Sequence, residues 1–153
     1  MLLTKLERIL LFLTIFLLPT QLGRHFWPGF AFIYSLPVDY LSPTVFFWDL
    51  LVIFLIAAFI LKNGGVNRVA LNLWLLFILT QALSLWPLLD QPIRVGPGLV
   101  RMEQYLFAGL FGVYLASKNL RKISGIVFWA LTLAILSQSI LAIAQFFGGT
   151  TLG

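Results

Sequence analysis

The sequence contains no cysteine and only one histidine, His25. Without thiols the chain forms neither disulfides nor a thiolate metal site, and one imidazole does not build a histidine metal site. The sequence also has no Walker loop, no dinucleotide-binding glycine pattern and no serine nucleophile elbow. We therefore expect neither a metal ion nor a cofactor.

Charge is equally scarce in this chain. Charged residues make up 10% of the 153 residues and hydrophobic residues 61%, and the mean hydropathy is +1.02. Such a composition leaves too little polar surface to cover a water-soluble globule, so the protein requires lipid as its solvent. The net charge of +5 then belongs at helix ends that face an anionic leaflet, and we expect no nucleic-acid partner.

Long apolar runs predict an all-α fold, a polytopic bundle of five transmembrane helices. The runs cover residues 6–22, 45–61, 69–89, 99–117 and 123–147, within a single transmembrane domain spanning residues 1–153. In the hydrocarbon core each run must satisfy its own backbone N–H and C=O groups, which favours helices. The runs also lack the alternating polar and apolar residues of a β-barrel wall. Ser42 and Pro43 suit the N-cap and first position of the second helix.

Basic residues set the predicted orientation. They form three clusters between alternate runs, namely Lys5/Arg8, Lys62/Arg68 and Lys118/Arg121/Lys122. By the positive-inside bias these clusters face the cytoplasm, so the amino terminus is predicted inside and the carboxyl terminus outside. The first run resembles a signal peptide, but residues 19–23 lack the small-x-small cleavage pattern. We interpret it as an uncleaved signal anchor.

The long first outer loop, residues 19–43, is rich in aromatic residues. Aromatic rings prefer the headgroup level, so this loop is predicted to lie in the membrane interface. Within it, Arg24 and His25 are candidates for binding a phosphate or diphosphate headgroup. The alternative is that both side chains snorkel to the interface without a ligand.

Arg94 and Arg101 also lie on the predicted outer face, where the positive-inside bias disfavours cations. We hypothesise that they share an anionic-lipid site with Arg24, because arginine forks suit a diphosphate. The competing interpretation is neutralisation by nearby carboxylates, for instance an ion pair of Asp49 with Arg101. The other acidic residues available on this face are Asp39, Asp90 and Glu103.

Small residues predict two packing faces. In the fourth run, Ala108, Gly112 and Ala116 recur every four residues with Gly109 alongside, a spacing that lets helix backbones approach closely. The fifth run carries a second stripe whose two amides are predicted to point into the bundle. Interhelical hydrogen bonding explains those amides better than substrate binding. The stripe consists of Ala130, Ala134, Gln138, Ala142 and Gln145.

Three stretches resemble bacterial O-antigen ligase and polymerase proteins: residues 17–28 (LLPTQLGRHFWP), 38–44 (VDYLSPT) and 138–147 (QSILAIAQFF). The resemblance implies the amino-terminal part of a multispan glycosyltransferase in the bacterial cytoplasmic membrane. Such an enzyme transfers a glycan from an undecaprenyl diphosphate carrier to an acceptor outside the membrane. The histidine base of that family lies in a large outer loop. Arg24 and His25 do not match its motif, so no catalytic residue is carried over.

Two other functions remain open. The first is a small noncatalytic membrane subunit that packs against a larger partner through the seam formed by Ala108, Gly112 and Ala116. The second is a small transporter, which is disfavoured because the runs carry no strongly polar residue near mid-membrane for a substrate path.

Overall fold

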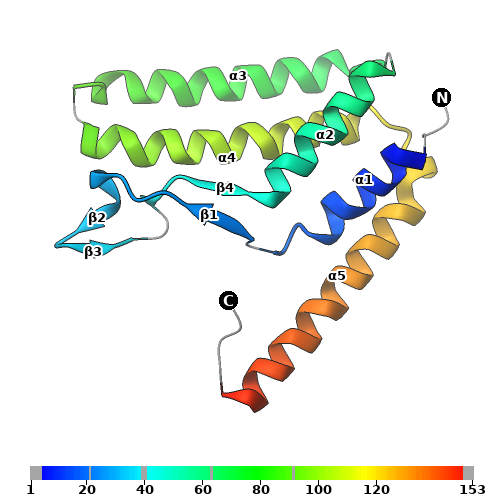
Figure 1. Ribbon diagram of the computed structural model, residues 1–153. Coiled ribbons are helices and arrows are strands. Elements are labelled where there is room, and N and C mark those ends of the chain that lie inside the picture. The colour runs from blue at the N-terminus through cyan, green and yellow to red at the C-terminus, as the bar shows by residue number, and fades with distance from the viewer. Residues whose placement is uncertain (1–4, 21, 39–40, 63, 91, 150–153) are drawn as a thin grey trace. The chain divides into compact units, whose positions relative to one another are not determined.

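The computed structural model describes residues 5–20, 22–38, 41–62, 64–90 and 92–149. This part of the chain is mostly helical (Figure 1). Its α-helices are α1 (Lys5–Phe16), α2 (Phe47–Leu61), α3 (Arg68–Leu85), α4 (Pro92–Ala116) and α5 (Leu120–Gly148). Contacts divide the chain into two compact units, one formed by Leu22–Lys118 and the other by Met1–Gln21 with Asn119–Gly153.

Two helices are long and apolar enough to cross a membrane, among the residues that the structure describes. They are α5 and the continuous stretch Arg68–Leu88, which joins α3 to the short 3-10 helix η3 (Trp86–Leu88). Asparagine side chains start both helices, since Asn67 accepts a hydrogen bond from Ala70 N and Asn119 accepts one from Arg121 N. These helices agree closely with the predicted runs 69–89 and 123–147.

The first predicted span is corrected by the structure. The run 6–22 suggested a helix that continues to Leu22, but α1, described from Lys5, ends at Phe16. Its described part of 12 residues is about 18 Å long. Pro19 explains the early end, because proline lacks a backbone N–H and disfavours helical geometry at the residue before it.

The fourth helix begins earlier than its apolar run. The run started at residue 99, whereas α4 starts at Pro92 and contains Pro97. Pro92 suits the first position of the helix, where the missing N–H of proline costs no hydrogen bond. The extra two turns hold Gly96 and Gly98, which two other segments approach closely.

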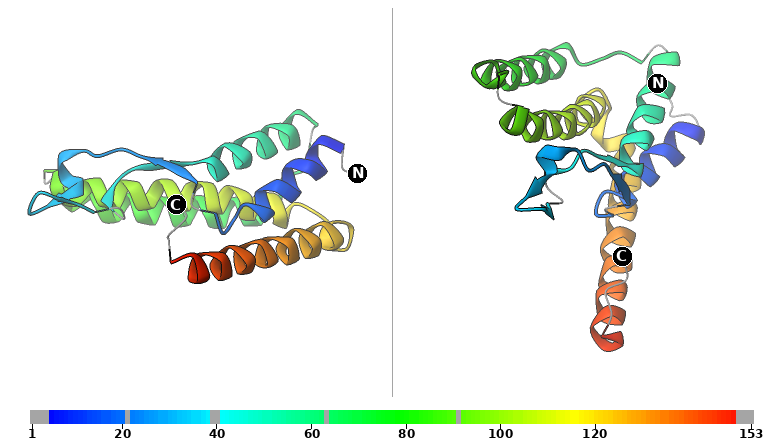
Figure 2. Two further views of the ribbon diagram at one scale, coloured as in Figure 1. Left: turned by 60° about the horizontal axis from the view of Figure 1, so that its bottom comes forward. Right: turned by 60° about the vertical axis from the view of Figure 1, so that its left-hand side comes forward.

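In the unit Leu22–Lys118, α4 packs against both α2 and α3. One stripe of α2 is buried, with Leu51, Leu55 and Phe59 spaced every four residues. Phe59 of α2 and Tyr114 of α4 pack edge to face, with ring centroids 5.4 Å apart and an interplanar angle of 85°. The right-hand view of Figure 2 shows α3 and α4 running side by side.

The α3–α4 contact uses one of the small residues expected on α4. A Cβ atom added to Gly109 would collide with the indole of Trp74, so glycine lets the two helices approach. In contrast, Ala108, Gly112 and Ala116 are exposed. The predicted seam therefore runs, within this unit, through Gly109 and leaves the strict four-residue stripe uncovered.

At one end of the same unit, polar side chains that flank α3 and α4 meet the last turn of α2. The backbone N–H of Asn67 donates to Ser117 Oγ at 2.8 Å, and Asn67 Nδ2 donates to Ala116 O at 3.2 Å. The Lys118 ammonium lies 4.3 Å from the Phe59 ring centroid, a cation–π distance. The end of α2, the start of α3 and the end of α4 thus meet at one level.

In the other unit, α1 lies along the first half of α5, and the two helices run in the same direction (Figures 1 and 2). Their interface buries Leu11 and Ile15 of α1 together with Ala130 and Ala134 of α5. The beginning of the predicted α5 stripe is thus a packing face. Beyond it, Gln138 and Gln145 are half-buried and Ala142 is exposed, because α1 is too short to reach them.

Candidate functional site

The first outer loop contains paired strands, which the sequence did not predict. Strand β1 (Gly23–His25) pairs antiparallel with β4 (Thr44–Phe46), and Arg24 lies opposite Val45. The backbone bond from Phe47 N to Leu22 O, 2.8 Å long, extends this ribbon. The predicted helix start at Ser42 and Pro43 is therefore wrong, because the residues after them continue as a strand and α2 begins only at Phe47.

The first face of the ribbon carries a hydrogen-bond network around His25. The Nδ1 atom of His25 lies 2.8 Å from Ser42 Oγ and 2.9 Å from Thr44 Oγ1. Ser42 and Thr44 are both buried, with exposed fractions of 2% and 5%. On its exposed side, the imidazole stacks on Trp27 with ring centroids 5.6 Å apart. The ring is therefore held from two sides.

The two hydroxyl residues of this network are also linked to each other. The Thr44 hydroxyl donates to Ser42 O at 3.2 Å, and the donor and acceptor roles at His25 Nδ1 depend on the tautomer. Among the described residues, His25 Nε2 has no hydrogen-bond partner.

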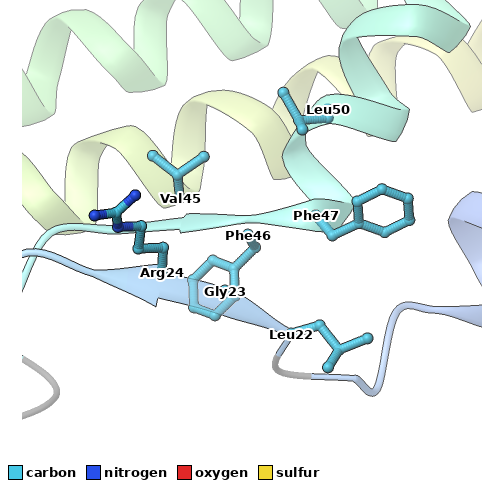
Figure 3. A pocket seen from close by; sticks show the side chains of 7 residues that line it. All are labelled: Leu22, Gly23, Arg24, Val45, Phe46, Phe47 and Leu50. Atoms are coloured by element: carbon cyan, nitrogen blue, oxygen red, sulfur yellow. The ribbon is translucent and has the colours of Figure 1, made fainter.

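The opposite face of the ribbon carries Arg24. Its guanidinium lies 5.7 Å from the Phe26 ring centroid, and guanidinium groups remain charged in proteins. Arg24 also lines an open, largely apolar hollow of about 510 Å³, and it is the charged residue among the described residues that line it. Figure 3 shows Arg24 and Val45 on one side of the strands and Phe46 on the other. The hollow is lined by Leu22, Gly23, Arg24, Val45, Phe46, Phe47 and Leu50.

Arg24 and His25 therefore do not converge on one ligand. Successive residues of a strand point to opposite faces, and each side chain stacks on the aromatic residue two positions later, Phe26 or Trp27. Their adjacency in sequence suggested a joint headgroup site. Because both residues lie in a strand, the same adjacency places their side chains on opposite faces of the ribbon.

Two of the outer arginines line different hollows. Arg101 lines a second, smaller hollow of about 200 Å³ between α3 and α4, together with Gln81, Ser84, Leu85, Gly98 and Tyr105. None of these residues lines the hollow that contains Arg24. The side chain of Arg94 lies outside the described residues. The lipid site shared by Arg24, Arg94 and Arg101 therefore stays a hypothesis.

Asp49 is part of a helix start and does not pair with Arg101. Its carboxylate accepts a hydrogen bond from the backbone N–H of Phe46 at 2.9 Å, as favoured in the first turn of a helix. On α4, Glu103 is the carboxylate close to Asp49, and these two like charges repel each other. Residues two apart on a helix point in nearly opposite directions, so Arg101 faces α3 when Glu103 faces α2.

Sequence inspection missed the two hydroxyls and the apolar hollow. The signal for Ser42 and Thr44 was present in the Ser-Pro-Thr pattern, but it was assigned to a helix cap. The described residues contain no group of three or more His, Cys, Asp or Glu side chains that could hold a metal ion. No protein-family model, no curated protein and no solved structure matches this chain.

Proposed function

We propose that this protein is a polytopic membrane protein of the bacterial cytoplasmic membrane and that its Arg24 hollow binds the headgroup of a polyprenyl diphosphate. The membrane placement is supported by the two helices of membrane length. It is also supported by the polar end of the unit Leu22–Lys118, where Asn67 donates to Ala116 O and the Lys118 ammonium lies over the Phe59 ring. In the proposed topology this end faces the cytoplasm and the β1–β4 ribbon faces outward.

The observation that carries the ligand is one cation in the lining of an otherwise apolar hollow. The described lining combines Arg24 with the apolar side chains of Leu22, Val45, Phe46, Phe47 and Leu50. A polyprenyl diphosphate is complementary to this arrangement, because it carries a negatively charged headgroup on an apolar chain. Arginine forks bind phosphate oxygens through paired charge-assisted hydrogen bonds, and apolar walls suit the first isoprene units.

Together with the resemblance to O-antigen ligases, this ligand makes the chain a membrane module of an O-antigen ligase-like glycosyltransferase. Its task is to hold an undecaprenyl diphosphate-linked glycan at the outer face for transfer to an acceptor. The residues of this chain are not assigned a catalytic role, because Arg24 and His25 point to different faces of the ribbon.

Native mass spectrometry of the protein in nanodiscs tests this function, with undecaprenyl diphosphate, undecaprenol and inorganic diphosphate as separate ligands. We expect binding of undecaprenyl diphosphate that exceeds binding of either half alone. Arg24→Gln should weaken it about tenfold or more, since a hydrogen bond to a charged group contributes roughly 1.5–3 kcal/mol.

Arg68→Gln is the matched control, because Arg68 is an exposed arginine at the start of α3. It should leave the affinity unchanged. Equal affinities of the wild-type protein and Arg24→Gln, with both inserted in the membrane, would refute the diphosphate site.

A noncatalytic subunit is the second candidate function, favoured by the exposed small-residue face of α4. Gly112 has open space where a Cβ atom would be, and Ala108 and Ala116 are exposed on either side of it. Gly112→Leu should abolish co-purification with a membrane partner if this face is an interface. Unchanged partner recovery would remove this candidate.

A further inference from the structure

A short hairpin projects from the outer loop and has an unusual turn. Strands β2 (Phe32–Ile33) and β3 (Leu36–Pro37) pair antiparallel, and the bond from Val38 N to Ala31 O, 2.9 Å long, closes the base. The two loop residues, Tyr34 and Ser35, have φ values of 50° and 66°. Such a turn normally uses Asn or Gly, because positive φ is costly for bulky side chains. A tyrosine that occupies so costly a backbone conformation suggests a use for its ring.

The surface of the hairpin is apolar on both sides. The exposed fractions are 96% for Tyr34, 68% for Leu36, 44% for Ile33 and 42% for Phe32. Residues 26–38 contain no charged side chain. In water, a two-stranded hairpin is marginally stable, and an uncharged, apolar edge strand promotes aggregation. These properties fit a lipid environment and not an aqueous loop.

Two glycines of α4 fix the level of this hairpin relative to α3. Added Cβ atoms would meet the Phe30 ring at Gly96 and the Leu85 side chain at Gly98. These glycines are two residues apart, a rise of about 3 Å along the helix. Phe30, in the 3-10 helix η1 (Gly29–Ala31) just before β2, therefore lies near the level of Leu85.

That level is the end of the membrane-length stretch, since Leu85 lies three residues before Leu88, where Arg68–Leu88 ends. Figures 1 and 2 both place the β2–β3 hairpin beside this end of α3 and α4. If Arg68–Leu88 crosses the bilayer, the hairpin lies where that stretch leaves the hydrocarbon.

We infer that the β2–β3 hairpin is an interfacial anchor, inserted among the lipid headgroups of the outer leaflet with Tyr34 at its tip. Tyrosine suits this layer because its ring is apolar and its hydroxyl is polar, and Ile33 and Leu36 supply apolar contact below it. This inference rests on the proposed membrane placement of α3. It is independent of the diphosphate ligand.

The absence of cysteine allows single nitroxide labels to test the anchor. Ser35→Cys reports on the turn, Leu75→Cys on the middle of α3 and Gly65→Cys on the exposed α2–α3 link. The labelled proteins are placed in nanodiscs of phosphatidylethanolamine and phosphatidylglycerol. Power-saturation electron paramagnetic resonance then compares access to oxygen, which enters lipid, with access to a water-soluble nickel chelate.

We expect the Ser35 label to be oxygen-accessible and protected from nickel, intermediate between the Leu75 and Gly65 labels. Introducing Tyr34→Gly should shift the Ser35 label toward water. Glycine adopts positive φ readily, so this change keeps the turn and removes only the ring.

A Ser35 label as nickel-accessible as the Gly65 label, with Leu75 still in lipid, would overturn the anchor alone. A Leu75 label in water would overturn the membrane placement and the anchor together. A Ser35 label shielded from both reagents would show a protein contact in place of lipid, and an unchanged depth in Tyr34→Gly would exclude the ring as the anchor. Both of these results also overturn the inference.

Discussion

The Nδ1 atom of His25 lies 2.8 Å from the Oγ atom of Ser42, a residue 17 positions later in the chain and almost completely buried. This bond, with the parallel one to Thr44, closes the outer loop on itself. It links the two strands of the β1–β4 ribbon through side chains as well as through the backbone, and so it holds the ribbon that presents Arg24.

Replacing His25 should loosen this loop. In His25→Ala, the Ser42 and Thr44 hydroxyls each lose their hydrogen bond to the imidazole, at about 0.5–1.5 kcal/mol per bond, and the Trp27 ring loses its stacking neighbour. We expect faster proteolytic cleavage within residues 26–38 and a lower Tm in detergent. Arg24→Gln, on the opposite face of the ribbon, is the control and should change both measurements less. Equal effects of the two substitutions would contradict the structural role of His25.

Asp49→Ala should destabilise the start of α2 by about 1 kcal/mol, because the Phe46 N–H loses its acceptor. Asp49→Asn, which keeps an acceptor oxygen, should cost less. A double-mutant cycle with Arg101→Ala distinguishes this capping role from the ion pair first hypothesised. The two substitutions should be additive in unfolding free energy within about 0.5 kcal/mol. A larger coupling energy would restore the ion pair.

The two central glycines of α4 should respond differently to the same added methyl group. Gly109→Ala places a Cβ in the space occupied by Trp74, and overpacking of this kind costs about 1–3 kcal/mol. Gly112→Ala meets nothing and should be neutral or stabilising, since alanine favours helix. Thermal unfolding followed by tryptophan fluorescence measures both. A Gly109→Ala protein as stable as Gly112→Ala would show that Trp74 does not need the glycine.

The orientation can be decided with alkaline phosphatase fusions, which are active only outside the cytoplasm. Fusions after Leu36 and after Gly149 should be active, and a fusion after Asn67 should be inactive, because the basic clusters predict that the α2–α3 link faces inward. Immunoblots should confirm comparable amounts of the three fusions. The reverse activity pattern would invert the proposed topology and place the Arg24 hollow inside the cell.

The sequence alone was sufficient to locate most helices. Apolar runs and their polar breaks depend on neighbouring residues only, so α2, α3 and α5 occur where those runs predict them. The same local logic failed at α1, where apolar residues continue through Leu18 but the helix ends at Phe16. It also failed at Ser42 and Pro43, because a cap signal carries no information about a strand 17 residues away.

Tertiary structure decided which side chains meet. Pairing of β1 with β4 set the register, and with a period of two that register placed Arg24 and His25 on opposite faces. The position of α3 selected Gly109 from the neighbouring small residues of α4 and turned Arg101 toward Gln81. Each of these choices depends on a partner distant in sequence. The residue types determined which elements form, and long-range packing determined the faces that they present.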